Sequence, residues 1–214
     1  MKRINEIVDL ITPYKIVADV GCDHAYLIKR AFDLNLISKA YAIDNKKGPL
    51  NNAKMTLAGY QNVSFLLSDG LTDLASDTEV VVLAGMGGSL IVNILEKGLN
   101  KLDNVKRIII EANRNQDLVR KFASDNGFKI VYEKIIEEDS IFYEIIVLEK
   151  GFCKLSSLEI KFGPLLLKQR DELFIKKWQK QLLVYENKKS KYLDREIEKI
   201  KDVLKWKLRK LLII

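Results

Sequence analysis

Residues 16–27 read IVADVGCDHAYL, and this stretch predicts a strand, a tight acidic turn and the start of a helix. Its apolar beginning is typical of a strand that is buried on both faces of a parallel sheet. Gly21 allows a sharp turn and lets a ligand approach the backbone closely. Because ligands of open α/β sheets bind at the carboxyl ends of the strands, this turn is a candidate binding site.

The turn is acidic rather than glycine-rich. It lacks the G-x-G-x-x-G pattern of dinucleotide-binding sites, and the carboxylates of Asp19 and Asp23 would repel a pyrophosphate. Two carboxylates suit a ligand that carries positive charge. The ammonium and sulfonium groups of S-adenosylmethionine meet this requirement, so the sequence predicts that cofactor.

The first 150 residues alternate between predicted strands and helices. Further strands are expected at residues 39–43, 63–67, 80–84 and 107–111, and helices at residues 2–11, 25–34, 49–59, 89–98 and 116–126. Only four residues separate the last two strands, at 128–136 and 141–148, so these should pair antiparallel. A parallel sheet closed in this way predicts the class I S-adenosylmethionine-dependent methyltransferase fold, which is α/β and Rossmann-like, with seven strands and an antiparallel last strand. A nicotinamide-binding domain would continue with parallel strands.

Polar or glycine residues follow each of the first four predicted strands. An aspartate after the second strand can accept hydrogen bonds from ribose hydroxyls, and one after the third can accept from an adenine amino group. A single signal of this kind also arises from a helix cap or a turn, but its recurrence at successive strand ends indicates one site. The predicted cofactor-binding residues are Asp19, Gly21, Asp23, Asp44, Asn45, Ser68, Asp69, Gly70, Ala84, Gly85 and Met86.

Positive charge is concentrated in the last 64 residues. Residues 1–150 hold 19 basic and 21 acidic side chains, whereas residues 151–214 hold 17 and 8. An A+T-rich genome also raises lysine content, but it would raise it throughout the chain. The asymmetry favours a methyltransferase domain at 1–150 and a basic appendage at 151–214, whose lysines track the backbone of a nucleic acid.

The basic appendage is predicted to be helical from Ser156 onward. With a turn at residues 187–190, its two apolar stripes predict a helical hairpin or short coiled coil. We expect a monomer, with a dimer through these stripes as the alternative. The stripes are Leu166, Phe174, Trp178, Leu182 and Tyr185, and then Leu193, Ile197, Ile200, Leu204, Leu208 and Leu211.

Cysteine usage and hydropathy point to the cytoplasm. Cys22 and Cys153 are far apart and have no metal-ligand spacing, which fits a reducing compartment and predicts no metal site. No apolar stretch approaches the ~20 residues of a membrane span. We expect no association with a membrane.

Several motifs resemble the bacterial tRNA (adenine-N1)-methyltransferase family TrmK, which methylates adenosine at tRNA position 22. They are DVGCDHAYL at residues 19–27, SDGL at 68–71, AGMGG at 84–88 and FGPLL at 162–166. The resemblance covers essentially the whole chain and implies a tRNA substrate. It also implies that Arg3, in the N-terminal helix, contacts RNA phosphate. The chain departs from the family at Glu111-Ala112-Asn113, where Gln-Pro-Asn is usual.

The predicted catalytic residues are Asp23 and His24. Adenine N1 already has an in-plane lone pair, so no base need remove a proton before it attacks the methyl carbon. Attack moves positive charge onto the ring, which a carboxylate such as Asp23 would stabilise. His24 either contacts the extruded base or an RNA phosphate, or it closes the loop by hydrogen bonding, and the sequence leaves both interpretations open.

Three other functions compete with this interpretation. A methyltransferase of the same fold could act on a small molecule or protein, because fold does not fix substrate. A non-enzymatic RNA-binding protein would need no intact cofactor loops. A nicotinamide-dependent oxidoreductase is disfavoured by the missing glycine pattern and the antiparallel end of the sheet.

Overall fold

The computed structural model describes residues 2–188 and 190–211. Its centre is one mixed seven-stranded sheet with the strand order β3-β2-β1-β4-β5-β7-β6. The first five strands are parallel, and β7 is antiparallel to both β5 and β6. This arrangement confirms the predicted fold class. The strands are β1 (Ile16–Val20), β2 (Lys39–Asp44), β3 (Val63–Leu67), β4 (Val80–Met86), β5 (Arg107–Ala112), β6 (Phe128–Glu138) and β7 (Ile141–Lys150).

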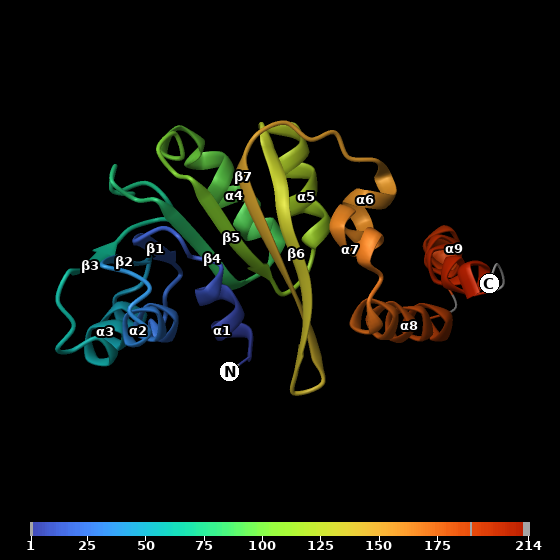
Figure 1. The fold of residues 1–214 in the computed structure, drawn as a ribbon, viewed down its shortest axis with the longest axis horizontal. Coiled ribbons are helices and arrows are strands. Elements are labelled where there is room, and N and C mark those ends of the chain that lie inside the picture. Colours follow the sequence, from blue (N-terminus) through green and yellow to red (C-terminus); the bar gives the residue numbers. More distant parts are fainter. Residues whose placement is uncertain (1, 189, 212–214) are drawn as a thin grey trace.

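Helices cover both faces of the sheet because its strands are apolar on both sides (Figure 1). In β4, Val80 and Val82 belong to the core under α1, α2 and α3, whereas Val81 and Leu83 belong to the core under α4 and α5. The layered helices are α1 (Lys2–Asp9), α2 (Tyr26–Asp33), α3 (Lys47–Thr56), α4 (Gly88–Lys97) and α5 (Gln116–Asp125), with the 3-10 turn η1 (Leu99–Lys101) after α4.

Helix ends differ from the expected ones by a few residues. The first helix ends at Asp9 rather than at residue 11. The third begins at Lys47, before Pro49, because a proline in the first helical turn gives up no helical hydrogen bond. The second begins after Ala25, whose left-handed backbone (φ 54°) lies outside the helix.

The basic appendage is helical but is not one continuous hairpin. Gly163, with a φ of 89°, separates the first two short helices, and Pro164 starts the second of them. The helices are α6 (Ser157–Phe162), α7 (Pro164–Gln169), α8 (Glu172–Asn187) and α9 (Asp194–Leu211), with the 3-10 turn η2 (Lys191–Leu193) before α9.

The apolar stripes of the appendage meet in a third core. It contains Leu166, Phe174 and Trp178 together with Ile200, and it is anchored on the sheet by Ile135 of β6. The expected coiled coil is not confirmed, because α8 lies across the view in Figure 1 while α9 is seen close to end-on, so the two helices cross. The expectations for Lys189 and for the side chains of Leu208 and Leu211 fall outside the described part of the chain.

None of the described helices is long and apolar enough to cross a membrane.

Candidate active site

The sheet order brings the predicted loops together at the carboxyl ends of the parallel strands. Strands β3, β2, β1 and β4 are parallel neighbours, with Val20 aligned with both Ile43 and Leu83, and Asp44 with Leu67. Their carboxyl ends therefore lie side by side. Open α/β sheets bind their ligands at these carboxyl ends.

A cavity of about 270 Å³ opens between the ends of β1 and β4. Helix α1 closes one side of it with Ile4 and Ile7, so the N-terminal segment is part of the site. Eight residues with predicted functions line this cavity, namely Arg3, Asp19, Gly21, Asp23, His24, Ala84, Gly85 and Met86.

Asp19 lines the cavity, and Asp44, which does not line it, adds a second buried carboxyl group nearby at the end of β2. Both residues are buried, with only 5% and 8% of their surfaces exposed. Burial, and then the nearby charge of Asp44, raise the pKa of Asp19 to about 7. Asp44 accepts hydrogen bonds from the backbone N–H of Lys46 at 3.0 Å and of Asp23 at 3.5 Å. A buried carboxylate held in this way gains most from a cationic ligand, so the site fits the charged groups of S-adenosylmethionine.

Two glycines bring the backbone to the wall of the cavity. Gly21 and Gly85 both have a φ of 76°, a conformation that other residues rarely adopt. A Cβ atom on Gly21 would lie 3.4 Å from the side chain of Met86 across the cavity. The turn after β1 is also unusual at Asp23, where φ is 45° without a glycine.

Asp23 and His24 lie at the exposed rim. The carboxylate of Asp23 is 3.9 Å from His24 Nε2, and the side chains of Asp23 and His24 are 66% and 44% exposed. The His24 ring stacks on Tyr26 with a centroid separation of 5.3 Å. An exposed rim position suits contact with an incoming base, and the Tyr26 stacking suits a structural role, so both interpretations of His24 stay open.

The other predicted cofactor residues do not line this cavity, although they follow the neighbouring strands β2 and β3. Asn45 is exposed. The Ser68 hydroxyl accepts from the backbone N–H of Asp73 at 3.3 Å. The exposed Asp69 carboxylate lies 3.9 Å from Lys97, and Gly70, with a φ of 61°, packs against Ile94. Their contact with the adenosine part of the cofactor stays a prediction.

An ion pair that the sequence did not predict links α1 to β5, next to Gly85 of β4. Glu111, which is fully buried, accepts hydrogen bonds from Arg3 at 3.2 Å and from the Gly85 backbone N–H at 3.0 Å. The Arg3 guanidinium also lies 4.5 Å from the ring centroid of Tyr143. Burial raises the pKa of Glu111, and Arg3 opposes that shift. Arg3 is thus engaged within the protein, and its contact with RNA phosphate stays a prediction.

A second unpredicted network joins the appendage to the sheet. Arg120, fully buried in α5, donates to Glu133 of β6 at 2.7 Å and to Glu144 of β7 at 2.5 Å. Lys177 of α8 pairs with the same Glu144. Burial alone would raise the pKa of Glu144, but Arg120 and Lys177 hold it below its ordinary value. Glu133 also accepts from the backbone N–H of Leu165, which fixes the start of α7.

Neither a reactive thiol nor a metal-binding cluster occurs among the described residues of the site. The Cys22 thiol is kept neutral because burial and the charge of Asp19 raise its pKa. No group of three or more His, Cys, Asp or Glu side chains able to hold a metal occurs among residues 2–188 and 190–211.

Comparison with known proteins identifies the family. The TrmK family model, described as tRNA (adenine(22)-N(1))-methyltransferase, matches residues 17–212. A relative from Bacillus subtilis (strain 168), named tRNA (adenine(22)-N(1))-methyltransferase, is 32% identical over 191 residues, which cover 85% of this chain and 80% of the relative.

Solved structures agree with this match. A putative tRNA (m1A22) methyltransferase of Streptococcus pneumoniae, in complex with S-adenosyl-L-methionine, has a TM-score of 0.91 at 37% identity, covering 95% of this chain and 99% of that one. TrmK of M. capricolum, in complex with S-adenosyl-homocysteine, has a TM-score of 0.81 at 26% identity, and the match covers 99% of this chain and 96% of that one. The chain described here therefore belongs to the tRNA (adenine(22)-N(1))-methyltransferase family, TrmK.

Proposed function

We propose that this chain transfers the methyl group of S-adenosylmethionine to N1 of adenosine 22 in tRNA, at the cavity between β1 and β4. The observation that carries the assignment is the buried Asp19 at the base of that cavity. It is a carboxylate whose raised pKa makes a cationic ligand favourable. Bound there, the cofactor supplies an activated methyl group on its sulfonium.

The protein contributes binding and alignment. Asp19 and the Gly21 backbone hold the charged end of the cofactor, and Asp44 accepts from its ribose hydroxyls. Asp69, at the end of the neighbouring β3, accepts from the adenine amino group. The Gly85 loop lines the space in which the target base meets the methyl group.

The target adenosine must leave its stack before it can react. N1 lies on the Watson–Crick edge, so the base is extruded into the open side of the cavity. Catalysis then consists of holding N1, the methyl carbon and sulfur in line. Asp23, at the rim, stabilises the positive charge that develops on the ring, and His24 contacts the base.

The basic appendage supports this function by binding the tRNA backbone. Phosphate contacts position the RNA without reading its sequence. The chain acts as a monomer, because the apolar residues Leu166, Phe174, Trp178 and Ile200 are already buried within the chain.

Two transcripts test the assignment. The protein is incubated with radiolabelled S-adenosylmethionine and an unmodified tRNA carrying adenosine at position 22, or the same tRNA with guanosine there. We expect label only in the first. Equal labelling of both would contradict the position, and labelling of neither would contradict the tRNA substrate.

A further inference from the structure

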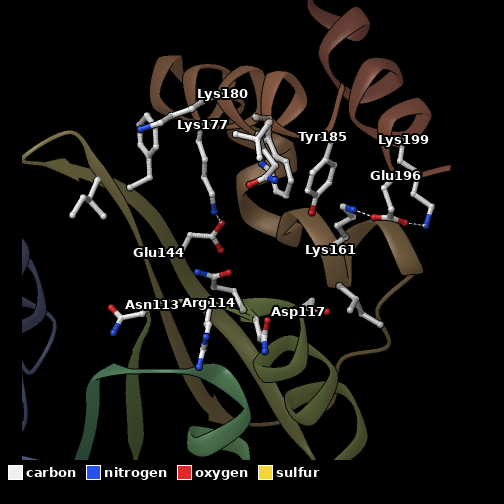
Figure 2. A pocket seen from close by; sticks show the side chains of 18 of the residues that line it. Asn113, Arg114, Asp117, Glu144, Lys161, Lys177, Lys180, Tyr185, Glu196 and Lys199 are labelled. Carbon is white, nitrogen blue, oxygen red and sulfur yellow. Dashed lines mark hydrogen bonds and ion pairs between the residues drawn. The ribbon is translucent and has the colours of Figure 1, made fainter. Parts of the chain in front are cut away.

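A second cleft, of about 800 Å³, lies between the sheet and the appendage (Figure 2). Its walls come from the loop after β5 and the start of α5 on one side, and from α6, α8 and α9 on the other. It shares no lining residue with the cofactor cavity, but the two are adjacent. Asn113, at the edge of the cleft, donates to the carbonyl oxygens of Gly85 and Met86, and both of these residues line the cofactor cavity.

The cleft has more positive than negative charge. Five cationic and three acidic side chains line it. Lys161 and Lys199 share the single carboxylate of Glu196, so one ammonium group lacks its own counter-charge. Burial and the neighbouring Lys199 lower the pKa of Lys161 to about 8, as expected where ammonium groups are crowded.

Two more cations in the cleft have no acidic partner. Arg114 and Lys180 are exposed, and neither pairs with a carboxylate in the described part of the chain. Lys180 donates to the carbonyl oxygen of Ser140 and lies 5.6 Å from the ring centroid of Phe142. Both cations are therefore available to an anion.

Unused backbone hydrogen-bond donors lie along the cleft at the start of α5. The ten-residue helix α5 begins there at Asn115, whose side chain does not cap it, so the positive end of the helix dipole is open to a ligand. Asp117, in the first turn of α5, carries a carboxylate that would repel an anion. Trp178 is 7% exposed, and its buried indole N–H has no acceptor among the described residues.

We propose that this cleft binds the sugar–phosphate backbone of the tRNA next to the target nucleotide. The inference rests on the proposed function and extends it. An RNA strand whose target base enters the cofactor cavity continues past Asn113, where Arg114, Lys180 and the start of α5 meet its phosphates. An arginine fork and a helix N-terminus are both suited to phosphate oxygens. The cleft positions the RNA, and the sequence of the flanking bases does not affect its contacts.

A charge-matched pair of double variants tests the proposal. Arg114→Gln with Lys180→Gln removes the two cations that have no acidic partner among the described residues, and both positions are exposed, so the fold should be kept. Lys101→Gln with Lys106→Gln removes the same charge just before the amino-terminal end of β5, whereas Arg114 follows the carboxyl end of that strand. Binding of unmodified tRNA to the full chain is measured at several salt concentrations, and cofactor binding is measured in parallel.

We expect only the cleft variant to bind tRNA more weakly. The slope of log K against log salt should become shallower by about one to two, because each lost phosphate contact contributes about 0.9. Cofactor affinity should be unchanged in both variants. Equal slopes for the two double variants would overturn the proposal.

Trp178 provides a local readout that does not depend on methylation. Trp206 is the only other tryptophan in the sequence, so Trp206→Phe leaves Trp178 as the reporter. Saturating tRNA should change its emission, and the cleft variant should need more tRNA for the same change. An emission that tRNA leaves unaltered would overturn the proposal. A wild-type chain whose Trp178 responds to tRNA, but which does not methylate it, would contradict the proposed function while supporting the cleft as an RNA site.

Discussion

Replacing Asp19 by asparagine should stabilise the protein in the absence of cofactor. Burial and Asp44 raise the pKa of Asp19 from its ordinary 3.8 to about 7. The folded chain therefore holds a proton that the unfolded chain loses above about pH 4, and the stability of the folded chain falls as the pH rises toward 7. At about 1.4 kcal/mol per pKa unit, the full penalty above pH 7 is about 4 kcal/mol. Asparagine carries no charge and therefore avoids this penalty.

Urea unfolding of wild type and Asp19→Asn at pH 5 and pH 8 checks this magnitude. The variant should be more stable by about 4 kcal/mol at pH 8 and by about 2 kcal/mol at pH 5, where the wild-type carboxyl is protonated in the folded state. Asp69→Asn is the control, because the Asp69 side chain is 72% exposed, and it should shift stability by less than about 0.5 kcal/mol. A stability difference for Asp19→Asn that does not change with pH would refute the reasoning.

The same carboxyl predicts how cofactor binding depends on pH. Only ionised Asp19 attracts a cationic ligand, and its ionised fraction rises as the pH passes 7. The affinity of the wild type for S-adenosylmethionine should therefore increase about eightfold between pH 6 and pH 7.5. Asp19→Asn should bind more weakly and show no such increase, whereas a flat wild-type profile would contradict the role of this residue.

Three further substitutions probe the rest of the structure. Arg120→Ala should lower the free energy of unfolding by about 3–5 kcal/mol, because it leaves the buried carboxylate of Glu133 without a cationic partner and that of Glu144 with Lys177 alone. The exposed Lys121→Ala should change it by less than about 0.5 kcal/mol, and chemical denaturation compares the two variants. Glu111→Gln should keep an acceptor for the Gly85 N–H and bind the cofactor almost as well as the wild type. Glu111→Ala removes that acceptor and should weaken cofactor binding. Calorimetry measures both affinities. His24→Ala should keep its cofactor affinity and lose tRNA turnover, and full turnover would leave only the structural role.

The sequence was sufficient to predict the sheet. Several strands contain continuous apolar runs, such as residues 80–83 and 108–110, and the short length of these runs favours a strand over a helix. The four residues between the last two predicted strands indicated an antiparallel pair, and in the structure only residues 139 and 140 separate β6 from β7. The acidic turn predicted a ligand site after the first strand, and a cavity lies there because the parallel order of β1 and β4 brings Asp19 and Gly85 together.

The missed features depend on partners that are distant in the sequence. Arg120 looks like a surface residue of an amphipathic helix until Glu133 and Glu144 approach it from β6 and β7. Glu111 looked like a departure from the family pattern, and its ion pair with Arg3 joins residues 108 positions apart. The break at Gly163-Pro164 was visible as a glycine–proline pair, but residues from Ser156 onward were all predicted to be helical.

The central claim is methylation at N1 of adenosine, and the identity of the product nucleoside tests it most directly. Unmodified tRNA is labelled by the full chain with radiolabelled S-adenosylmethionine, digested to nucleosides at neutral pH, and separated beside standards. We predict that the label elutes with N1-methyladenosine. Label in any other nucleoside, or no label from a protein that binds the cofactor, would contradict the account.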